Sequence, residues 1–262
     1  MAYISPTLTL MIAAVKKTAA ALGRDFNELE HLQNSVHGDN SFAQRSYEKV
    51  QKILREELGK IKAGYPVICS MADALPASGK FFAVQPLDGF ANFAHGNAAF
   101  ALSVALVENN AVVGAVVYSP INDELFFAEK GSGAFKEGFR NHERLRVASA
   151  KNADKALVLA NAERAAVESA LKVTTNPRIS GSTVLDLAYV AAGKADAAIA
   201  VASNLCELAA GVLLVKEAGG YIFAVGETDV RSENLQKALF GGSIFATNEA
   251  LRQKIADAAA KN

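Results

Sequence analysis

The chain has 262 residues, of which 51% are hydrophobic and 21% are charged, so it can bury a sizeable core. Lys plus Arg and Asp plus Glu both number 27, and this balance argues against a dedicated nucleic-acid or anionic-membrane surface. The two cysteines, Cys69 and Cys206, are too few for a disulfide framework and indicate a reducing, cytoplasmic compartment.

The N-terminal part is predicted to form two helices. Residues 8–22 and 41–58 place apolar side chains at helical spacing, and a polar stretch containing Gly38 separates them. The apolar run at 7–15 is short and has no basic residue before it. We therefore expect neither a signal peptide nor a membrane span.

The pattern changes near residue 65, where short apolar and β-branched runs replace the helical spacing. These runs lie at 66–69, 80–84, 100–107, 111–118, 125–129 and 134–136. The Glu-Asn-Asn tripeptide at 108–110 separates two of them and is typical of a hairpin turn. Residues 65–147 are therefore predicted to form an antiparallel sheet, with the Asp-Glu pair at 123–124 in a solvated turn.

The last part alternates between strand and helix patterns, which indicates an α/β lobe. Strands are predicted at 157–159, 195–201, 221–224 and 243–246, and helices at 183–192 and 206–218. Asn248 is expected to cap a final helix that runs through Ala260. No Pro-rich or Ser-rich linker interrupts the chain. We expect one compact domain over 1–262, with an α+β lobe at about 1–147 and an α/β lobe at about 148–262.

The sequence Gln85-Pro86-Leu87-Asp88-Gly89 directly follows one of the predicted strands. A carboxylate in such a turn can face a cleft, and a glycine lets the backbone N–H groups come close to an anion. On spacing alone, an Asp-Gly turn is more often structural than catalytic.

Longer segments around this turn carry a family resemblance. They are PLDGFANFAHG at 86–96, ALSVALVENNAVVGAVVYSPINDELFFAEKGSGAF at 101–135, GSTVLDLAYVAAGKADA at 181–197 and ELAAGVLLVKEAGGYI at 207–222. In this order they resemble the inositol monophosphatase family, and within it the bacterial SuhB-like branch. The resemblance implies a layered α-β-α-β-α fold, usually a homodimer, and Mg²⁺-dependent hydrolysis of a phosphate monoester.

The resemblance assigns the metal ligands to four positions. Asp88 keeps the second aspartate of the metal loop, and the backbone carbonyl of Leu87 is retained beside it. Gln85 stands where the loop has its first aspartate, and Glu207 replaces a later aspartate that opens a helix. Because clustered Mg²⁺ ions need several carboxylates to offset their charge, this set predicts a weak or absent magnesium site.

The positions that would handle the attacking water also differ from the family pattern. The glutamate that binds metal and orients the water corresponds to Ser70, and the threonine that positions the water corresponds to Phe90. No catalytic residue is therefore intact at these two positions. Other family positions that differ are His37, Ser41, Tyr47 and the sugar-contacting position Ala200.

The resemblance also implies substrate or phosphate contacts in two short segments. Their residues are Gly89, Phe90, Gly181, Ser182 and Thr183. Residues 181–183 are equally typical of a plain helix N-terminus. Asp88 can likewise be an ordinary turn residue, and Glu207 can be a carboxylate that the helix dipole favours at a helix start. The segment at 159–181 is shorter than in the family, which puts the substrate wall and the dimer interface in doubt.

Two functional hypotheses follow. The first is a protein with a degraded Mg²⁺ site that acts by binding a small phosphorylated ligand or a protein, and the SuhB-like branch suggests a partner in the transcription machinery. The alternative is a working phosphomonoesterase for inositol phosphate or a related sugar phosphate, with one ion on Asp88, Glu207 and Gln85. Cys69 and Cys206 are expected beside this site, as packing residues or as a redox or soft-metal pair.

Overall fold

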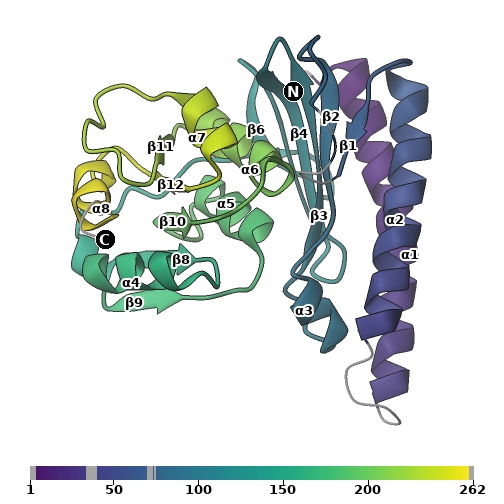
Figure 1. Ribbon diagram of the computed structural model, residues 1–262, viewed down its shortest axis with the longest axis horizontal. Coiled ribbons are helices and arrows are strands. Elements are labelled where there is room, and N and C mark those ends of the chain that lie inside the picture. Colours follow the sequence, from purple (N-terminus) through teal and green to yellow (C-terminus); the bar gives the residue numbers. More distant parts are fainter. Residues whose placement is uncertain (1–3, 34–39, 70–72, 74, 260–262) are drawn as a thin grey trace.

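The computed structural model describes residues 4–33, 40–69, 73 and 75–259, and the predicted connection around Gly38 lies outside them. In the described chain, two β-sheets alternate with helical layers (Figure 1). In order, the layers are α1 (Pro6–Gln33) with α2 (Asn40–Ile61), the larger sheet, α5 (Thr183–Ala191) with α6 (Leu205–Glu217), the smaller sheet, and α4 (Arg164–Val173) with α8 (Arg252–Ala259). The predicted α-β-α-β-α layering is confirmed.

Helix α1 is longer than predicted, because its apolar spacing continues beyond Leu22. Phe26 and Leu29 follow four and seven residues later on the same helix face, and both are buried. Phe26 packs against Phe93 and Phe100, with ring centroids 5.8 and 5.1 Å apart. The extra turns of α1 therefore complete the core between the first helical layer and the larger sheet.

The larger sheet contains the six runs predicted between residues 66 and 136 and a further strand, β7, in the order β1-β2-β3-β4-β5-β6-β7. They are β1 (Val67–Ile68), β2 (Phe81–Asp88), β3 (Ala101–Glu108), β4 (Ala111–Ser119), β5 (Glu124–Glu129), β6 (Gly133–Lys136) and β7 (Glu143–Arg144). The pairing is antiparallel except between β1 and β2, which run parallel. β2 passes its predicted end at Val84, so Gln85 to Asp88 belong to an irregular strand end rather than to a turn.

The smaller sheet has the order β11-β12-β10-β8-β9, with parallel pairs around β8 and antiparallel pairs around β12. Its strands are β8 (Leu157–Ala160), β9 (Asn176–Arg178), β10 (Ala197–Ala200), β11 (Tyr221–Ala224) and β12 (Ile244–Thr247). β9, α4 and α7 (Leu235–Gly241) lie where the sequence pattern predicts no element. The last helix begins at Arg252, and Asn248, which is expected to cap it, accepts a hydrogen bond from the Leu251 N–H at 3.0 Å just before the helix.

One buried cluster joins the facing sides of the two sheets through α5 and α6. Gly211 of α6 faces Leu187 of α5, and a Cβ added at Gly211 would lie 2.4 Å from the Leu187 Cβ. Glycine therefore lets the two helices pack closely. Their N-termini both lie beside the end of β2, where the predicted site is found.

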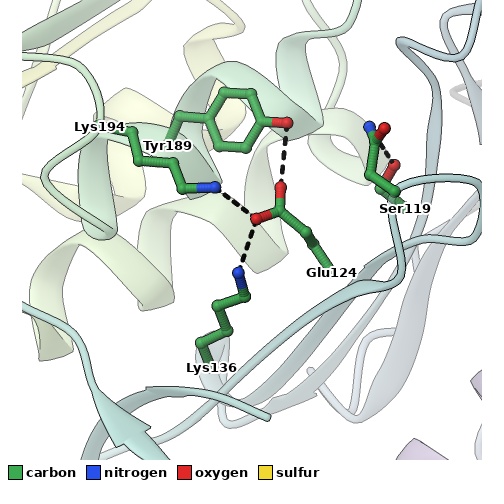
Figure 2. A network of polar contacts seen from close by, with 6 residues as sticks. Ser119, Glu124, Lys136, Tyr189 and Lys194 are labelled. Atoms are coloured by element: carbon green, nitrogen blue, oxygen red, sulfur yellow. Dashed lines mark hydrogen bonds and ion pairs between the residues drawn. The ribbon is translucent and has the colours of Figure 1, made fainter. Parts of the chain in front are cut away.

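Glu124 connects the larger sheet to the α5 region, and the prediction of a solvated turn is wrong for this residue (Figure 2). Lys136 donates to its carboxylate at 2.7 Å, Lys194 forms an ion pair with it, and the Tyr189 hydroxyl donates to it at 3.2 Å. Burial raises the pKa of Glu124, but the hydrogen bonds from the two lysines outweigh burial and lower it overall. Asp123, with φ +49°, does lie in the turn.

Candidate functional site

Asp88, the surviving aspartate of the predicted metal loop, lies at the end of β2 and is buried. Its carboxylate accepts hydrogen bonds from the Ser182 hydroxyl at 2.5 Å and from the Val184 backbone N–H at 2.8 Å. Burial raises the pKa of Asp88, while its hydrogen bonds act in the opposite direction. Asp88 therefore accepts a hydrogen bond from a backbone N–H group at the N-terminus of α5, which has no acceptor within the helix itself.

Ser182 and Thr183, predicted either to contact substrate or to begin a helix, lie at the start of α5. The Ser182 hydroxyl accepts a hydrogen bond from the Leu185 N–H at 3.3 Å while it donates to Asp88. Thr183 is the first residue of the helix and is buried. The observed contacts of Ser182 are those of a helix cap.

Gly89 and Gly181, predicted to lie beside an anion, occupy places where the chain passes close to other segments. Gly89 has φ +81°, and an added Cβ would lie 2.7 Å from the carbonyl oxygen of Ala99. Gly181 has φ +83°, and an added Cβ would lie 2.7 Å from Nδ2 of Asn92, which donates to the Ser180 carbonyl. Both positions require glycine for backbone conformation and space, independently of any ligand.

Asp186 is a second buried carboxyl group at this end of α5, and it is not among the predicted site residues. It is 2% exposed and accepts a hydrogen bond from the Ser180 hydroxyl at 2.6 Å. Burial raises its pKa to about 8, and the nearby Asp88 acts in the same direction. An aspartate in the first turn of a helix is ordinarily an exposed, dipole-stabilised residue, so its position in the sequence gives no signal of burial.

Glu207, the second predicted carboxylate ligand, forms a capping box at the start of α6. Its carboxylate accepts from the Asn204 backbone N–H at 3.2 Å and from the Asn204 side-chain amide at 2.7 Å. In return, the Asn204 side chain accepts from the backbone N–H groups of Cys206 and Glu207. Burial raises the pKa of Glu207, and the charge of Asp88 adds to this effect.

A cleft of about 410 Å³ opens where the ends of β1 and β2 meet α2, α3 (Phe90–Ala94) and the N-terminus of α6. Its lining residues are Gln44, Tyr47, Cys69, Gln85, Leu87, Phe90 and Asn204. The cleft thus brings together Gln85, Leu87 and Phe90, whereas Asp88 and Glu207 are not among its described lining residues. The described lining carries three carboxamides and a phenol, but neither a carboxylate nor a basic group.

The two cysteines lie beside this cleft, as the family resemblance implied. Both are buried free thiols, and Cys206 Sγ lies 3.4 Å from the carbonyl oxygen of Ile68, the residue that precedes Cys69. Burial raises the pKa of Cys69 and raises that of Cys206 to about 12. Both thiols are therefore protonated at neutral pH, which favours packing over thiolate chemistry.

Of the remaining described positions that differ from the family pattern, one lines the cleft and two do not. Ser70 and His37 lie outside the described residues. Ser41 is exposed near the start of α2, and Ala200 is buried at the end of β10. Tyr47 lines the cleft, and burial raises its pKa.

The donor set in the described residues does not fit a magnesium cluster. These residues contain no group of three or more His, Cys, Asp or Glu side chains arranged to hold a metal ion. The carboxylates of Asp88 and Glu207 are already bound to the N-termini of α5 and α6. Since Mg²⁺ requires several converging oxygen ligands, this arrangement offers too few.

The fold and the order of the site segments agree with comparisons to known proteins. A family model for the inositol monophosphatase family matches residues 4–262. The chain belongs to the inositol monophosphatase family. It is 37% identical to an inositol-1-monophosphatase of Rhizobium meliloti (strain 1021), with 96% of each chain covered. It is also 32% identical to a Nus factor SuhB of Xylella fastidiosa (strain Temecula1 / ATCC 700964), with 83% of this chain and 81% of the relative covered.

Solved structures of inositol monophosphatase family members show the same layered architecture. The extragenic suppressor protein suhB of Bartonella henselae matches with a TM-score of 0.82 and 30% identity, over 99% of this chain and 100% of that chain. An inositol monophosphatase from Anabaena (Nostoc) sp. PCC 7120 matches with a TM-score of 0.77 and 25% identity, over 96% and 94% of the two chains. Within the described residues, no helix is long and apolar enough to cross a membrane.

Proposed function

We propose that this member of the inositol monophosphatase family acts by binding and hydrolyses phosphate esters poorly or not at all. One observation carries the proposal: donors at the N-termini of α5 and α6 already form hydrogen bonds with both carboxylates. Asp88 pairs with the Val184 N–H, and Glu207 closes a capping box with Asn204. The cleft beside them is lined by neutral side chains among the described residues.

The chemistry of metal-assisted hydrolysis explains why this arrangement matters. Divalent ions neutralise phosphoryl oxygens and lower the pKa of an attacking water, and they need charged oxygen ligands to stay in place. Phe90 lacks the hydroxyl that would position this water, and Gln85 lacks a charge. Loss of one catalytic group commonly costs about 10²–10⁴-fold in rate, and several losses together remove most catalysis.

The proposed binding role extends to a protein partner. Several relatives bear the name Nus factor SuhB, including the Xylella fastidiosa protein. This name supports a partner in the transcription machinery. A cytoplasmic location and a homodimer, both expected from the sequence, belong to the same proposal.

A working phosphomonoesterase is the second candidate, and the Rhizobium meliloti relative named inositol-1-monophosphatase favours it. In this chain it would use one Mg²⁺ ion on Asp88, Glu207, Gln85 and the Leu87 carbonyl. Each carboxylate would then share its oxygens between the ion and the donors at the N-terminus of α5 or α6. The candidate therefore predicts that Mg²⁺ binding changes the surroundings of these helix N-termini.

Turnover of a panel of sugar phosphates, with and without Mg²⁺, distinguishes the two candidates. We expect no Mg²⁺-dependent rate in the unaltered protein and a gain of turnover only after Gln85→Asp, Ser70→Glu and Phe90→Thr are combined. Calorimetry with Mg²⁺ at millimolar concentration supplies an independent measurement. Turnover by the unaltered protein at ordinary enzyme rates, about 1–10³ s⁻¹, would refute the binding role.

A further inference from the structure

We propose that a second cavity, between α7, the C-terminal half of α6 and the β3–β4 hairpin, binds a free amino acid whose side chain is apolar and about the size of leucine. The cavity has a volume of about 230 Å³. None of its lining residues lines the candidate cleft described above, and none is a predicted site residue. The proposal therefore does not depend on whether this chain hydrolyses phosphate esters.

The cavity lies at the other end of α6 from the candidate site. Glu207, at the start of α6, belongs to that site, whereas Glu217, the last residue of the helix, lines the cavity. At a rise of about 1.5 Å per residue, these two residues are about 15 Å apart along the helix axis. Figure 1 shows α7 beside α6, next to the larger sheet. The cavity is thus a separate place, where the larger sheet and α7 meet the end of α6.

Much of the lining is apolar. Val112 of β4, Val212 and Leu213 of α6, and Leu239 of α7 line the cavity, and all four are buried. Leu235, the first residue of α7, adds a partly buried apolar side chain. Water beside such side chains finds few hydrogen-bond partners, so an apolar group of a ligand replaces it favourably.

The volume of the cavity limits the size of the ligand. Drug-sized ligands occupy sites of about 300–1,000 Å³, and an apolar cavity of about 150 Å³ is large enough for benzene. A volume of about 230 Å³ lies between these values. It suits one branched apolar side chain together with the two charged groups of an amino acid.

The cavity also carries a cationic group that is available to a ligand. Lys130, which follows β5, is exposed and lines the cavity. Among the described residues, no hydrogen-bond or ion-pair partner of its ammonium group is found. The other lysine of the lining, Lys216, is already paired with Glu233. Because an ammonium group has three donors and no acceptor, Lys130 is complemented by a carboxylate of the ligand.

An anionic group lies in the same lining. The Glu217 carboxylate accepts hydrogen bonds from the backbone N–H groups of Gly131 and Gly133, at 2.8 and 2.9 Å. Because Gly131 directly follows Lys130, these bonds hold the carboxylate beside the chain segment that carries the lysine. A carboxylate has about four acceptor positions, so two remain for the ammonium group of a ligand.

An amino acid matches both charges and the apolar lining at once. Its carboxylate, its ammonium group and its side chain are attached to one carbon atom, so all three reach their partners within a small volume. A carboxylic acid without an amine would leave the charge of Glu217 unmatched, and an amine without a carboxylate would leave that of Lys130 unmatched. The lining therefore favours an apolar amino acid over ligands that carry only one of these charges.

Calorimetry and ligand-observed NMR on the full chain test the proposal. The probes are L-leucine, 4-methylpentanoate, which lacks the ammonium group, 3-methylbutylamine, which lacks the carboxylate, and glycine, which lacks the side chain. We expect L-leucine to bind and each single-charge analogue to bind about 3- to 10-fold more weakly, the usual effect of one lost charged contact. Glycine should not bind at the same millimolar concentration.

Two pairs of matched variants test the lining residues. Lys130→Gln should remove the preference for L-leucine over 3-methylbutylamine, whereas Lys254→Gln on the exposed surface of α8 should keep it. Leu235→Gln should weaken binding of L-leucine, whereas Leu171→Gln on α4, where the leucine is 61% exposed, should not. Urea unfolding of each variant checks that the fold is intact.

Intermolecular NOEs locate the ligand in the unaltered protein, without any variant. The methyl groups of bound L-leucine should give NOEs to the side chains of Leu213 and Leu239. The proposal is overturned if L-leucine does not bind at millimolar concentration, or if its NOEs arise only from residues outside the cavity. It is also overturned if either single-charge analogue binds as tightly as L-leucine, or if Lys130→Gln and Lys254→Gln behave alike.

Discussion

The Asp88 carboxylate at the end of β2 accepts a hydrogen bond from the backbone N–H of Val184, at 2.8 Å, in the first turn of α5. One buried carboxylate thus joins the larger sheet to the central helical layer. The residue assigned to a metal by family resemblance has a structural role that requires no metal. Its stability contribution can therefore be measured directly.

Asp88→Ala should lower the free energy of unfolding by about 1–3 kcal/mol, because it leaves buried donors at α5 without an acceptor. Urea unfolding of the two proteins measures this difference. Added Mg²⁺ should leave the midpoint of the unaltered protein unchanged, since a ligand raises stability only when it binds the folded state. A midpoint that rises with Mg²⁺ in the unaltered protein, but not in Asp88→Ala, would instead place a metal at Asp88.

Asp186 should make the protein less stable as pH rises. Its folded-state pKa is raised from 3.8 to about 8, so between these values the folded state holds a proton that the unfolded state has released. Stability from this group is complete below about pH 4 and is lost progressively up to about pH 8. Asp186→Asn keeps an acceptor for Ser180 and removes this slope.

Urea midpoints measured at several pH values between 4 and 9 test the Asp186 prediction. The gain of Asp186→Asn over the unaltered protein should grow as pH rises through this window. The exposed residue Asp257 provides the control, because Asp257→Asn should shift the midpoints little. A gain that is constant with pH would show that Asp186 is ionised in the folded protein.

Glu207→Ala should cost about 1 kcal/mol of stability, because it removes the reciprocal half of the capping box at α6. Glu207→Gln should retain most of this stability, since an amide oxygen can still accept from the Asn204 N–H. Thermal unfolding of both variants is the measurement. If the two variants lost equal stability, the negative charge rather than the cap would be the important feature.

Cys206 should react slowly with thiol reagents in the folded protein. Raising its pKa from 9.0 to about 12 leaves on the order of 10³-fold less thiolate at neutral pH. Alkylation by iodoacetamide, followed by mass spectrometry, should modify both cysteines rapidly only after unfolding. Fast formation of a Cys69–Cys206 disulfide in the folded protein would contradict the packing role.

Much of the fold is visible in the sequence because it depends on local patterns. The hairpin runs, the α5 and α6 helices and the layered order follow from apolar spacing and family motifs. The end of α1 and the position of Glu124 are not visible locally. Phe26 is held by rings at 93 and 100, and Glu124 by lysines 12 and 70 residues away.

The residues that line the candidate cleft could be predicted from the sequence, but the hydrogen bonds between the site's elements could not. Gln85, Leu87 and Phe90 do line one cleft, as their place in one motif suggests. The sequence could not reveal that Asp88 caps α5, because Val184 lies 96 residues further along the chain. It also could not distinguish a buried Asp186 from an ordinary helix-end aspartate, because burial depends on packing between layers.

Gly211→Ala should destabilise the protein by about 1–3 kcal/mol, because α5 and α6 pack too closely to accept a methyl group. The added Cβ would lie 2.4 Å from Cβ of Leu187, and both helices belong to the central layer. Gly59 in α2 is the matched control, since an added Cβ there has no atom within 4 Å. Gly59→Ala should therefore stabilise the protein by about 0.5–1 kcal/mol through helix propensity. Urea unfolding of both variants should show shifts of opposite sign, and a stabilising Gly211→Ala would refute the close packing of α5 on α6.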